Sequence, residues 1–375
     1  MAGIYIHIPY CRQACTYCNF HFSTSLKHKK DLLQALVTEI NLTAPKDNVE
    51  TIDTVYFGGG TPSLLTSEEL TFIFNSVHNH FYISPQAEIT LEANPDDISK
   101  KILADWLQLG VNRLSLGIQS FDEDELRWMN RAHNAAQSLQ SIDDIIEAGF
   151  TNFSVDLIYG SPLLNNNTLK KNAEIIFNKK IPHISAYALT VEAKTALYKM
   201  IEKHDSPAID TNRQAEQFEI LLQLTEDAGY EQYEISNFAR PGYRSRHNSS
   251  YWQGKPYYGF GPAAHSFDGK NIRRWNIANN ALYIQSLKKN EIPFEEEILT
   301  REQQLNEYIM TSLRTIEGLN LEIVNKKFGA EEVKKILAQS KKYLEEKLMR
   351  QENGFIILNK EGKFLADGIA ADLFF

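Results

Sequence analysis

Three cysteines lie close together near the start of the chain, at Cys11, Cys15 and Cys18, directly behind the apolar run at 4–9, and the 375 residues contain no other cysteine. A segment this short can bring three sulfurs around one small inorganic group, because seven extended residues span at most about 25 Å. Thiolates are soft ligands that select zinc, copper(I) or iron-sulfur clusters. The spacing therefore predicts a metal or cluster site.

The spacing leaves the inorganic group open. Zinc in a structural site needs four protein ligands, and His7 or His21 would complete its tetrahedron. A [4Fe-4S] cluster held by three cysteines would instead leave one iron open, where a small molecule can be bound and reduced. The sulfurs would also share one stripe of a helix as core residues, but Pro9 and the strand pattern before it favour a loop. A disulfide framework is disfavoured, because the cysteine count is odd and no secretory leader precedes it.

The glycine run 58–60 and the polar residues near it are the other candidates for chemistry. Glycines let a backbone approach a ligand closely, although Gly58 to Pro62 would also serve as a plain tight turn. Glu92 is either a functional carboxylate or a solvated turn or helix cap. Arg131 has a rigid fork that fits a carboxylate bidentately, and its default role is a surface salt bridge.

These residues have to be positioned by regular elements, and the chain alternates short β-branched runs with longer amphipathic segments. The expected strands are 4–8, 52–57, 87–91, 113–118, 152–158 and 183–189. The expected helices are 30–43, 67–81, 100–109, 135–148 and 169–178. This alternation predicts parallel pairing with right-handed crossovers. We expect an α/β fold, a partial (β/α)6 TIM-like barrel that is open on one side.

In such barrels the chemistry lies at the carboxyl ends of the strands. The cysteine loop follows the first expected strand, and the glycine run follows the second. Glu92 closes the third strand, Gln119 closes the fourth, and Asp156 lies near the end of the fifth. The sequence therefore places all five features on one rim.

Composition bounds the class of protein. A formal charge of -9, with 23% charged and 43% hydrophobic residues, is typical of a soluble globular chain. The negative charge disfavours nucleic acid as a partner. No apolar run approaches the roughly 20 residues that a membrane-spanning helix needs. We expect no transmembrane segment and a cytoplasmic protein, which suits thiols that must stay reduced.

The composition of the chain changes beyond the expected barrel strands. Segment 230–275 is rich in aromatic residues, glycine and proline, and contains His247 within His-Asn-Ser-Ser-Tyr-Trp. It is either a loop-rich cap that packs its aromatics on the barrel mouth, with His247 hydrogen-bonded, or a porphyrin site. Haem iron takes a histidine as axial ligand, and its macrocycle needs apolar walls.

The tail forms a separate module by pattern. Residues 302–315, 321–328 and 331–348 predict helices, and 355–358 with 363–365 predict a hairpin around 360–362. This predicts a small α+β, winged-helix-like domain, a lid or a partner-docking domain, and its interleaved lysines and glutamates do not indicate DNA binding. The expected division is 1–240 for the barrel, 241–295 for the cap and 296–375 for the tail.

The order Tyr-x-His-Ile-Pro, then C-x3-C-x-Tyr-C, then Gly-Gly-Gly-Thr-Pro resembles the radical S-adenosylmethionine (SAM) superfamily. More narrowly it is similar to the branch that holds oxygen-independent coproporphyrinogen III oxidase and the HemW-type haem chaperones, over nearly the whole chain. The resemblance implies a [4Fe-4S] cluster on the three cysteines and SAM at the open iron, where SAM is cleaved reductively to a radical. The residues implied to bind SAM are Tyr5, Tyr17, Gly59, Gly60, Thr61, Glu92, Gln119, Arg131 and Asp156.

Within that branch the resemblance favours a haem chaperone. His-Asn-x-x-Tyr-Trp is similar to a segment implicated in haem binding there, so His247 is an expected haem contact. Phe20 stands where the oxidase has an additional cysteine, and the oxidase also carries an N-terminal extension. The implied partners are haem, an unknown acceptor protein and an electron donor such as flavodoxin or ferredoxin, and a visit to a membrane surface stays open. The alternative is the oxidase itself; a modifier of RNA or protein is disfavoured by the acidity and by the lack of a recognisable RNA-binding module.

Overall fold

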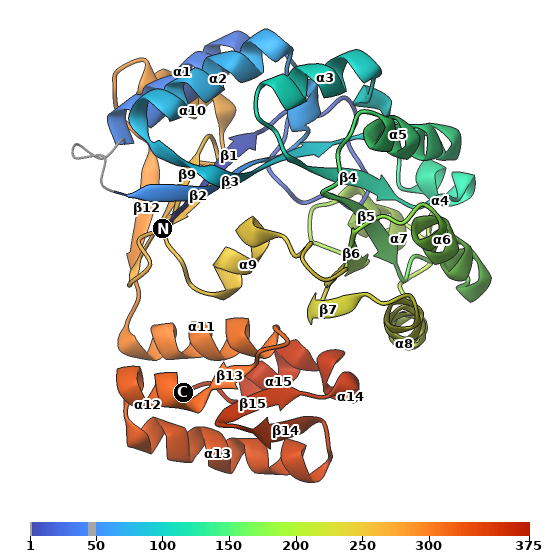
Figure 1. Ribbon diagram of the computed structural model, residues 1–375, viewed down its shortest axis with the longest axis vertical. Coiled ribbons are helices and arrows are strands. Elements are labelled where there is room, and N and C mark those ends of the chain that lie inside the picture. The colour runs from blue at the N-terminus through green and yellow to red at the C-terminus, as the bar shows by residue number, and fades with distance from the viewer. Residues whose placement is uncertain (1, 44–49) are drawn as a thin grey trace.

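The computed structural model describes residues 2–43 and 50–375, and its largest element is a 12-stranded sheet (Figure 1). Six strands pair in parallel and in chain order. They are β1 (Ala2–Ile8), β2 (Thr51–Gly59), β3 (Tyr82–Ala93), β4 (Arg113–Gln119), β5 (Phe153–Tyr159) and β6 (His183–Ala188). Each overlaps an expected strand. The predicted α/β class and partial barrel are confirmed.

Helices cover the outer face of this curved sheet (Figure 1). They are α1 (Lys29–Thr43), α2 (Ser67–His80), α3 (Lys100–Gln108), α4 (Glu123–Trp128), α5 (Ala135–Glu147), α6 (Asn166–Asn178) and α8 (Thr211–Asp227). The short helix α7 (Ala196–Glu202) lies beside the cysteine loop instead, where Leu197 N donates to Thr16 O at 2.7 Å. The local sequence sets the residue at which several of these helices begin. Thr66 with Glu69, and Asn134 with Gln137, form reciprocal capping boxes that satisfy the first free N–H groups of α2 and α5.

The sheet continues beyond the barrel strands at both edges. Past β1 it adds β9 (Tyr257–Phe260), β10 (His265–Phe267), β11 (Ile272–Asn276) and β12 (Phe294–Ile298), and past β6 it adds β8 (Asn237–Ala239) and β7 (Glu231–Glu234). Segment 241–295, where we expected loops, thus supplies strands together with α9 (Arg246–Trp252) and α10 (Asn280–Leu287). These strands are too short for their periodicity to be recognised among the glycines and prolines.

Glu39 of α1 ties this sheet extension to the barrel. It is buried, and its carboxylate accepts bonds from Gly261 N at 2.8 Å, Asn276 Nδ2 at 2.5 Å and Tyr283 Oη at 2.5 Å. Burial raises the pKa of Glu39 to about 7, against the lowering effect of these three donors. A carboxyl that serves three buried donors holds three separate segments in register.

Replacing Glu39 is expected to destabilise the fold. Glu39→Ala leaves three buried donors without their acceptor, and the free energy of unfolding should fall by about 2 kcal/mol in urea denaturation. Gln34→Ala, on the exposed side of the same helix, should change it by less than about 0.5 kcal/mol. Because the folded pKa is raised above the unfolded value, the contribution of the protonated carboxyl is complete at low pH and is lost as pH rises through about 7. The wild type should therefore lose stability relative to Glu39→Gln between pH 5 and pH 8, and equal slopes would contradict this.

The C-terminal domain has its own hydrophobic core, separate from that of the barrel. It consists of α11 (Arg301–Leu313), β13 (Leu319–Asn320), α12 (Leu321–Phe328), α13 (Ala330–Glu345), β14 (Met349–Glu352), β15 (Phe355–Leu358), α14 (Lys360–Lys363) and α15 (Ala366–Asp372). Helices α11, α12 and α13 overlap the three expected helices, and β13, β14 and β15 form a small antiparallel sheet, whereas α14 and α15 were not expected. Ile336 of α13 is buried, and Val333, Leu337, Leu344 and Leu348 pack against this core.

The predicted hairpin around 360–362 is wrong. β15 pairs with β14 instead, across Asn353 and Gly354, whose φ angles are 49° and 82°. Positive φ at both positions is typical of an Asn-Gly type I′ turn. Residues 360–363 form α14, where a Cβ on Gly362 would meet Leu348 O at 2.1 Å. The glycine marks close packing against β14, not a turn.

The C-terminal domain joins the barrel at β7. Ile316 N donates to Tyr233 O and Ile235 N donates to Arg314 O, both at 3.1 Å. None of the described helices is both long and apolar enough to cross a membrane.

Candidate functional site

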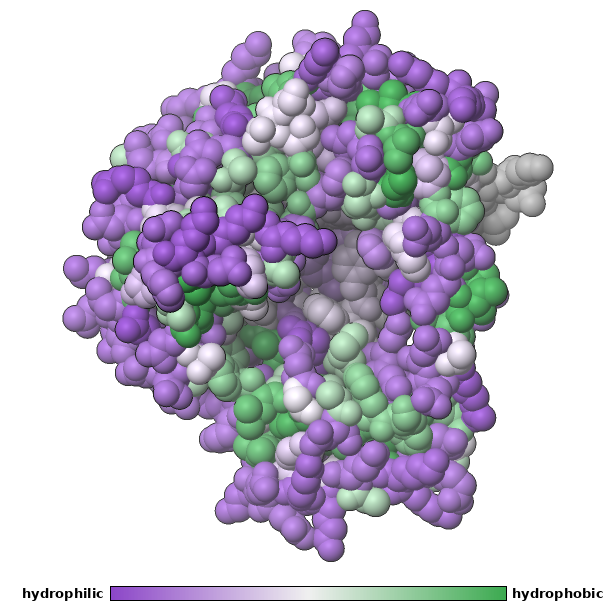
Figure 2. Space-filling model, turned by 180° about the vertical axis from the view of Figure 1, so that it is seen from behind, coloured by the Kyte–Doolittle hydropathy of each residue, from purple (hydrophilic) through white to green (hydrophobic). Residues whose placement is uncertain are grey.

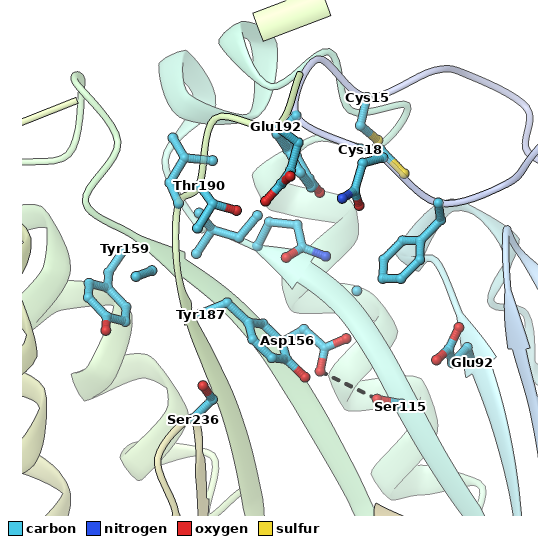
Figure 3. Close-up of a pocket in the computed structure, with 18 of the residues that line it drawn as sticks. Cys15, Cys18, Glu92, Ser115, Asp156, Tyr159, Tyr187, Thr190, Glu192 and Ser236 are labelled. Atoms are coloured by element: carbon cyan, nitrogen blue, oxygen red, sulfur yellow. Dashed lines mark hydrogen bonds between the residues drawn. The ribbon is translucent and has the colours of Figure 1, made fainter. Parts of the chain in front are cut away.

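A cavity of about 610 Å³ opens at the carboxyl ends of the barrel strands and extends to the C-terminal domain. Figure 2 shows a hollow between the two parts of the molecule, and Figure 3 shows its interior. All three cysteines line the cavity together with most of the residues predicted to bind SAM. These are Cys11, Cys15, Tyr17, Cys18, Gly59, Gly60, Thr61, Glu92, Gln119, Arg131 and Asp156. Tyr5 and His247 lie outside the lining. The five rim features predicted from the sequence do lie together.

The cysteine segment is a loop, not a helix. Backbone bonds hold it at several points, including Cys11 N to Ser23 O at 3.1 Å and Thr16 N to Met129 O at 3.0 Å. The three thiols are free and half-buried. Burial raises the pKa of Cys11 to about 11. Its thiol is therefore protonated at neutral pH, and a metal or cluster that binds there has to displace this proton.

The two histidines considered as zinc ligands are engaged elsewhere. His7 bonds Tyr5 Oη through Nδ1 at 3.1 Å and His21 O through Nε2 at 2.9 Å, and His21 Nε2 bonds Asn280 Oδ1 at 2.7 Å. No three His, Cys, Asp or Glu side chains among residues 2–43 and 50–375 are placed around a single ion. Among the described residues that line the cavity, the soft donors are the three thiols. This donor set fits a cluster that spreads three thiolates over three irons better than tetrahedral zinc.

The glycine run packs against the cysteine loop. A Cβ on Gly60 would lie 2.7 Å from Tyr10 O and 2.9 Å from Ile8 O, and Gly59 has a φ of 111° with the His7 ring 2.6 Å from its Cβ position. Only glycine fits at either position. Gly59 and Gly60 therefore form a closely packed part of the cavity wall beside the cysteines, which we call the glycine floor. A plain tight turn, the other possibility that the sequence allowed, would not require this packing.

Glu92 is half-buried at the cavity wall, and both of its carboxylate oxygens accept hydrogen bonds. Tyr56 Oη donates to its Oε1 at 2.7 Å, and Gly59 N donates to its Oε2 at 3.1 Å. Burial raises the pKa of Glu92 to about 7; the Tyr56 bond lowers it and the charge of Asp156 adds to the rise. Burial likewise raises the pKa of Asp156 to about 6. Figure 3 shows Asp156 bonded to Ser115. Two carboxyls poised near neutral pH are typical of a functional site.

Arg131 does not form the surface salt bridge that was its default role. Its Nη2 donates to Asn94 Oδ1 at 2.6 Å and to Gly117 O at 2.7 Å, and its Nη1 donates to Cys15 Sγ at 3.2 Å. Its Nε is buried and has no partner among the described residues. The guanidinium thus connects the cysteine loop to the ends of two strands, and its Nε–H remains available to donate to a ligand.

Tyr5 and His247 lie together on the barrel's concave side, beneath the cavity. The His247 ring stacks on Tyr56 with centroids 4.9 Å apart, and Tyr5 stacks on Tyr56 at 6.1 Å. His247 is 1% exposed, and its two ring nitrogens bond Thr54 Oγ1 and Tyr251 Oη, both at 2.8 Å. Its expected contact with haem stays a prediction, one that requires these bonds to break.

Several lining residues escaped the sequence analysis. Tyr187 of β6 lines the cavity, and Tyr56 of β2 lies outside the lining and donates to Glu92. Both side chains lie on the same face of the sheet as Glu92 and Asp156, and strand alternation was a usable signal for this. Arg314, Lys363, Phe364 and Asp367 come from the C-terminal domain. No local pattern marks these four, because only the domain arrangement brings them to the barrel.

Comparison with known proteins agrees with this geometry. The family model described as "Radical SAM superfamily" matches residues 5–176, and "HemN C-terminal domain" matches residues 299–365. Heme chaperone HemW of Mycobacterium tuberculosis (strain H37Rv) is 33% identical, covering 99% of this chain and 94% of that protein. Heme chaperone HemW of Bacillus subtilis (strain 168) is 32% identical, covering 98% of each.

The solved structure of coproporphyrinogen III oxidase (HemN) from Escherichia coli superposes with a TM-score of 0.87, over 99% of this chain and 90% of that one. At 21% identity this likeness shows the fold. A radical SAM domain implies a [4Fe-4S] cluster and SAM, which is the pair of cofactors that the three thiols and the glycine floor fit. With relatives above 30% identity along nearly its whole length, the chain belongs to the HemW family of radical SAM proteins.

Proposed function

We propose that this protein is a haem chaperone, which binds haem and transfers it to an acceptor protein. The observation that carries the proposal is that similarity to relatives named heme chaperone HemW runs through both the barrel and the C-terminal domain. The cavity is built from those same two parts, so any cargo held there would contact both.

In this proposal Cys11, Cys15 and Cys18 hold the [4Fe-4S] cluster, which supplies one-electron reducing chemistry when bound. SAM lies at the open iron, against the glycine floor. The side chains that orient it are Tyr5, Tyr17, Thr61, Glu92, Gln119, Arg131 and Asp156.

The proposal separates from the oxidase alternative in one anaerobic experiment. The protein is incubated with SAM, a reductant and either coproporphyrinogen III or haem, in the second case with a haem-free acceptor such as apomyoglobin. We expect no protoporphyrinogen from the first mixture, and a Soret band that moves to the acceptor in the second. Formation of protoporphyrinogen would instead support the oxidase.

His247 is proposed to contact haem once α9 moves. We expect His247→Ala to weaken haem binding about tenfold, the size of one charged or metal-assisted bond, and to shift the Soret band. Tyr251→Phe frees Nε2 and keeps the imidazole, so its affinity should equal or exceed that of the wild type. An unchanged Soret band and affinity in His247→Ala would remove His247 from the haem site.

We further propose that the cluster receives electrons from a flavodoxin or ferredoxin and that the protein acts in the cytoplasm, with a transient visit to a membrane surface during delivery. Fractionation of cells with and without an overexpressed membrane-bound acceptor tests the last point. Recovery of the protein in the membrane fraction only when the acceptor is present is the expected outcome.

A further inference from the structure

The two ends of the cavity differ in chemistry. One end carries the cysteine loop and the polar strand ends. At the other, Tyr159 stacks on Phe218 with centroids 6.1 Å apart, and Phe218 contacts Phe364 of the C-terminal domain at 6.0 Å. Figure 3 shows Tyr159 well apart from Cys15 and Cys18. Tyr159 and Phe218 are 5% and 3% exposed, whereas Phe364 is 43% exposed and its ring is tilted by 42° to that of Phe218. The apolar surface at this end of the cavity is therefore mainly that of Phe364, with Phe218 and Tyr159 packed next to it.

Lys363, the last residue of α14, also lines this end of the cavity and is half-buried. Its Nζ donates to Gln232 Oε1 at 2.8 Å, a neutral partner. Among the residues that the structure describes, no carboxylate lies within ion-pair distance of it. Burial lowers the pKa of Lys363 and the charges of Arg350 and Lys360 add to this, whereas those of Glu226 and Glu231 oppose it. An ammonium has three N–H donors. Lys363 therefore keeps free donors, and a charge without an ion-pair partner, at the cavity wall.

Arg314 lies on the same wall and has one exchangeable partner. Its guanidinium bonds Glu234 at 3.1 Å and Asp367 at 2.5 Å. The Glu234 side chain is 1% exposed, whereas that of Asp367 is 79% exposed and itself lines the cavity. An exposed ion pair contributes little to stability, so an incoming carboxylate can replace Asp367 on the guanidinium fork.

We propose that Lys363 and Arg314 form a carboxylate subsite that anchors the propionate groups of haem, while the macrocycle lies against the exposed ring of Phe364. A flat apolar macrocycle with carboxylates on one edge matches an exposed aromatic ring and two cations on the same cavity wall. This inference rests on the proposed function, because it takes haem as the cargo. It does not depend on which side chain ligates the iron.

The test compares ferric haem with its dimethyl ester, which keeps the ring and the iron and has no carboxylate. Wild type should bind haem about tenfold more tightly than the ester, the size expected for a charge-assisted bond. Lys363→Met should weaken haem binding about tenfold and leave ester binding unchanged, and Lys363→Arg should restore haem binding. Arg314→Gln, assayed in the same way, should act in the same direction.

Lys360→Met is the matched control. Lys360 opens the same helix, but it bonds Gln223 and Glu226 outside the cavity, so its removal should change neither affinity. Equal loss of haem and ester binding in Lys363→Met, or loss in Lys360→Met equal to that in Lys363→Met, would overturn the subsite. Wild type that binds haem with no preference over the ester would do the same and leave the proposed function intact. Failure of wild type to bind either probe would refute the proposed function, and the subsite with it.

Discussion

Replacing any one of Cys11, Cys15 and Cys18 by serine is expected to abolish the iron-sulfur cluster. The cavity faces only three thiols, so each substitution leaves two soft ligands and a hydroxyl, which is a poor ligand for iron in a cluster. Protein purified and reconstituted without air should show iron and sulfide contents near zero, where the wild type shows both. The reduced variants should lack the EPR signal of a [4Fe-4S] centre.

Ala14→Ser is the matched control for these variants. It introduces the same hydroxyl into the same loop at an exposed position and removes no thiol. Its iron, sulfide and EPR signal should equal those of the wild type. Wild-type protein that carries zinc in place of iron, or a cysteine variant that keeps full iron and sulfide, would contradict the cluster assignment.

The site was predictable from sequence where chain order alone sets position. Cys11, Gly59, Glu92, Gln119 and Asp156 each lie at or near the carboxyl end of a strand, and parallel pairing in chain order then forces them onto one rim. Strand recognition and one topological rule were sufficient for this.

The sequence was insufficient where partners are distant and the elements are short. The strands of residues 257–298 have three to five residues, too few for a period to stand out. The role of Gly362 depends on Leu348 O and not on its neighbours in the chain. Lys363 and Arg314 reach the cavity only because β7 holds the C-terminal domain there. Asn353-Gly354 is a recognisable turn sequence, but a second glycine-containing segment, at 360–362, was an equally plausible turn.

Glu92→Gln is expected to reduce SAM affinity about hundredfold, measured by anaerobic equilibrium binding to the cluster-loaded protein. The carboxylate accepts from both Tyr56 Oη and Gly59 N, and an amide has only one acceptor oxygen to offer. One buried donor therefore loses its partner, and SAM loses an anionic contact; together these correspond to about 2.7 kcal/mol.

The pH dependence of SAM binding carries an independent signature of Glu92. Burial raises its pKa to about 7, so below that pH the free protein holds the neutral acid, which attracts the cationic SAM less than the carboxylate does. Wild-type affinity should rise between pH 6 and pH 8. In Glu92→Gln any rise should be nearly complete by pH 7, because the remaining carboxyl of Asp156 has a pKa of about 6. Glu192→Gln removes another carboxylate that lines the cavity, an exposed one, and should change SAM affinity less than about threefold. A rise in affinity between pH 7 and pH 8 that persists in Glu92→Gln would assign the titration to another group and remove Glu92 from the SAM site.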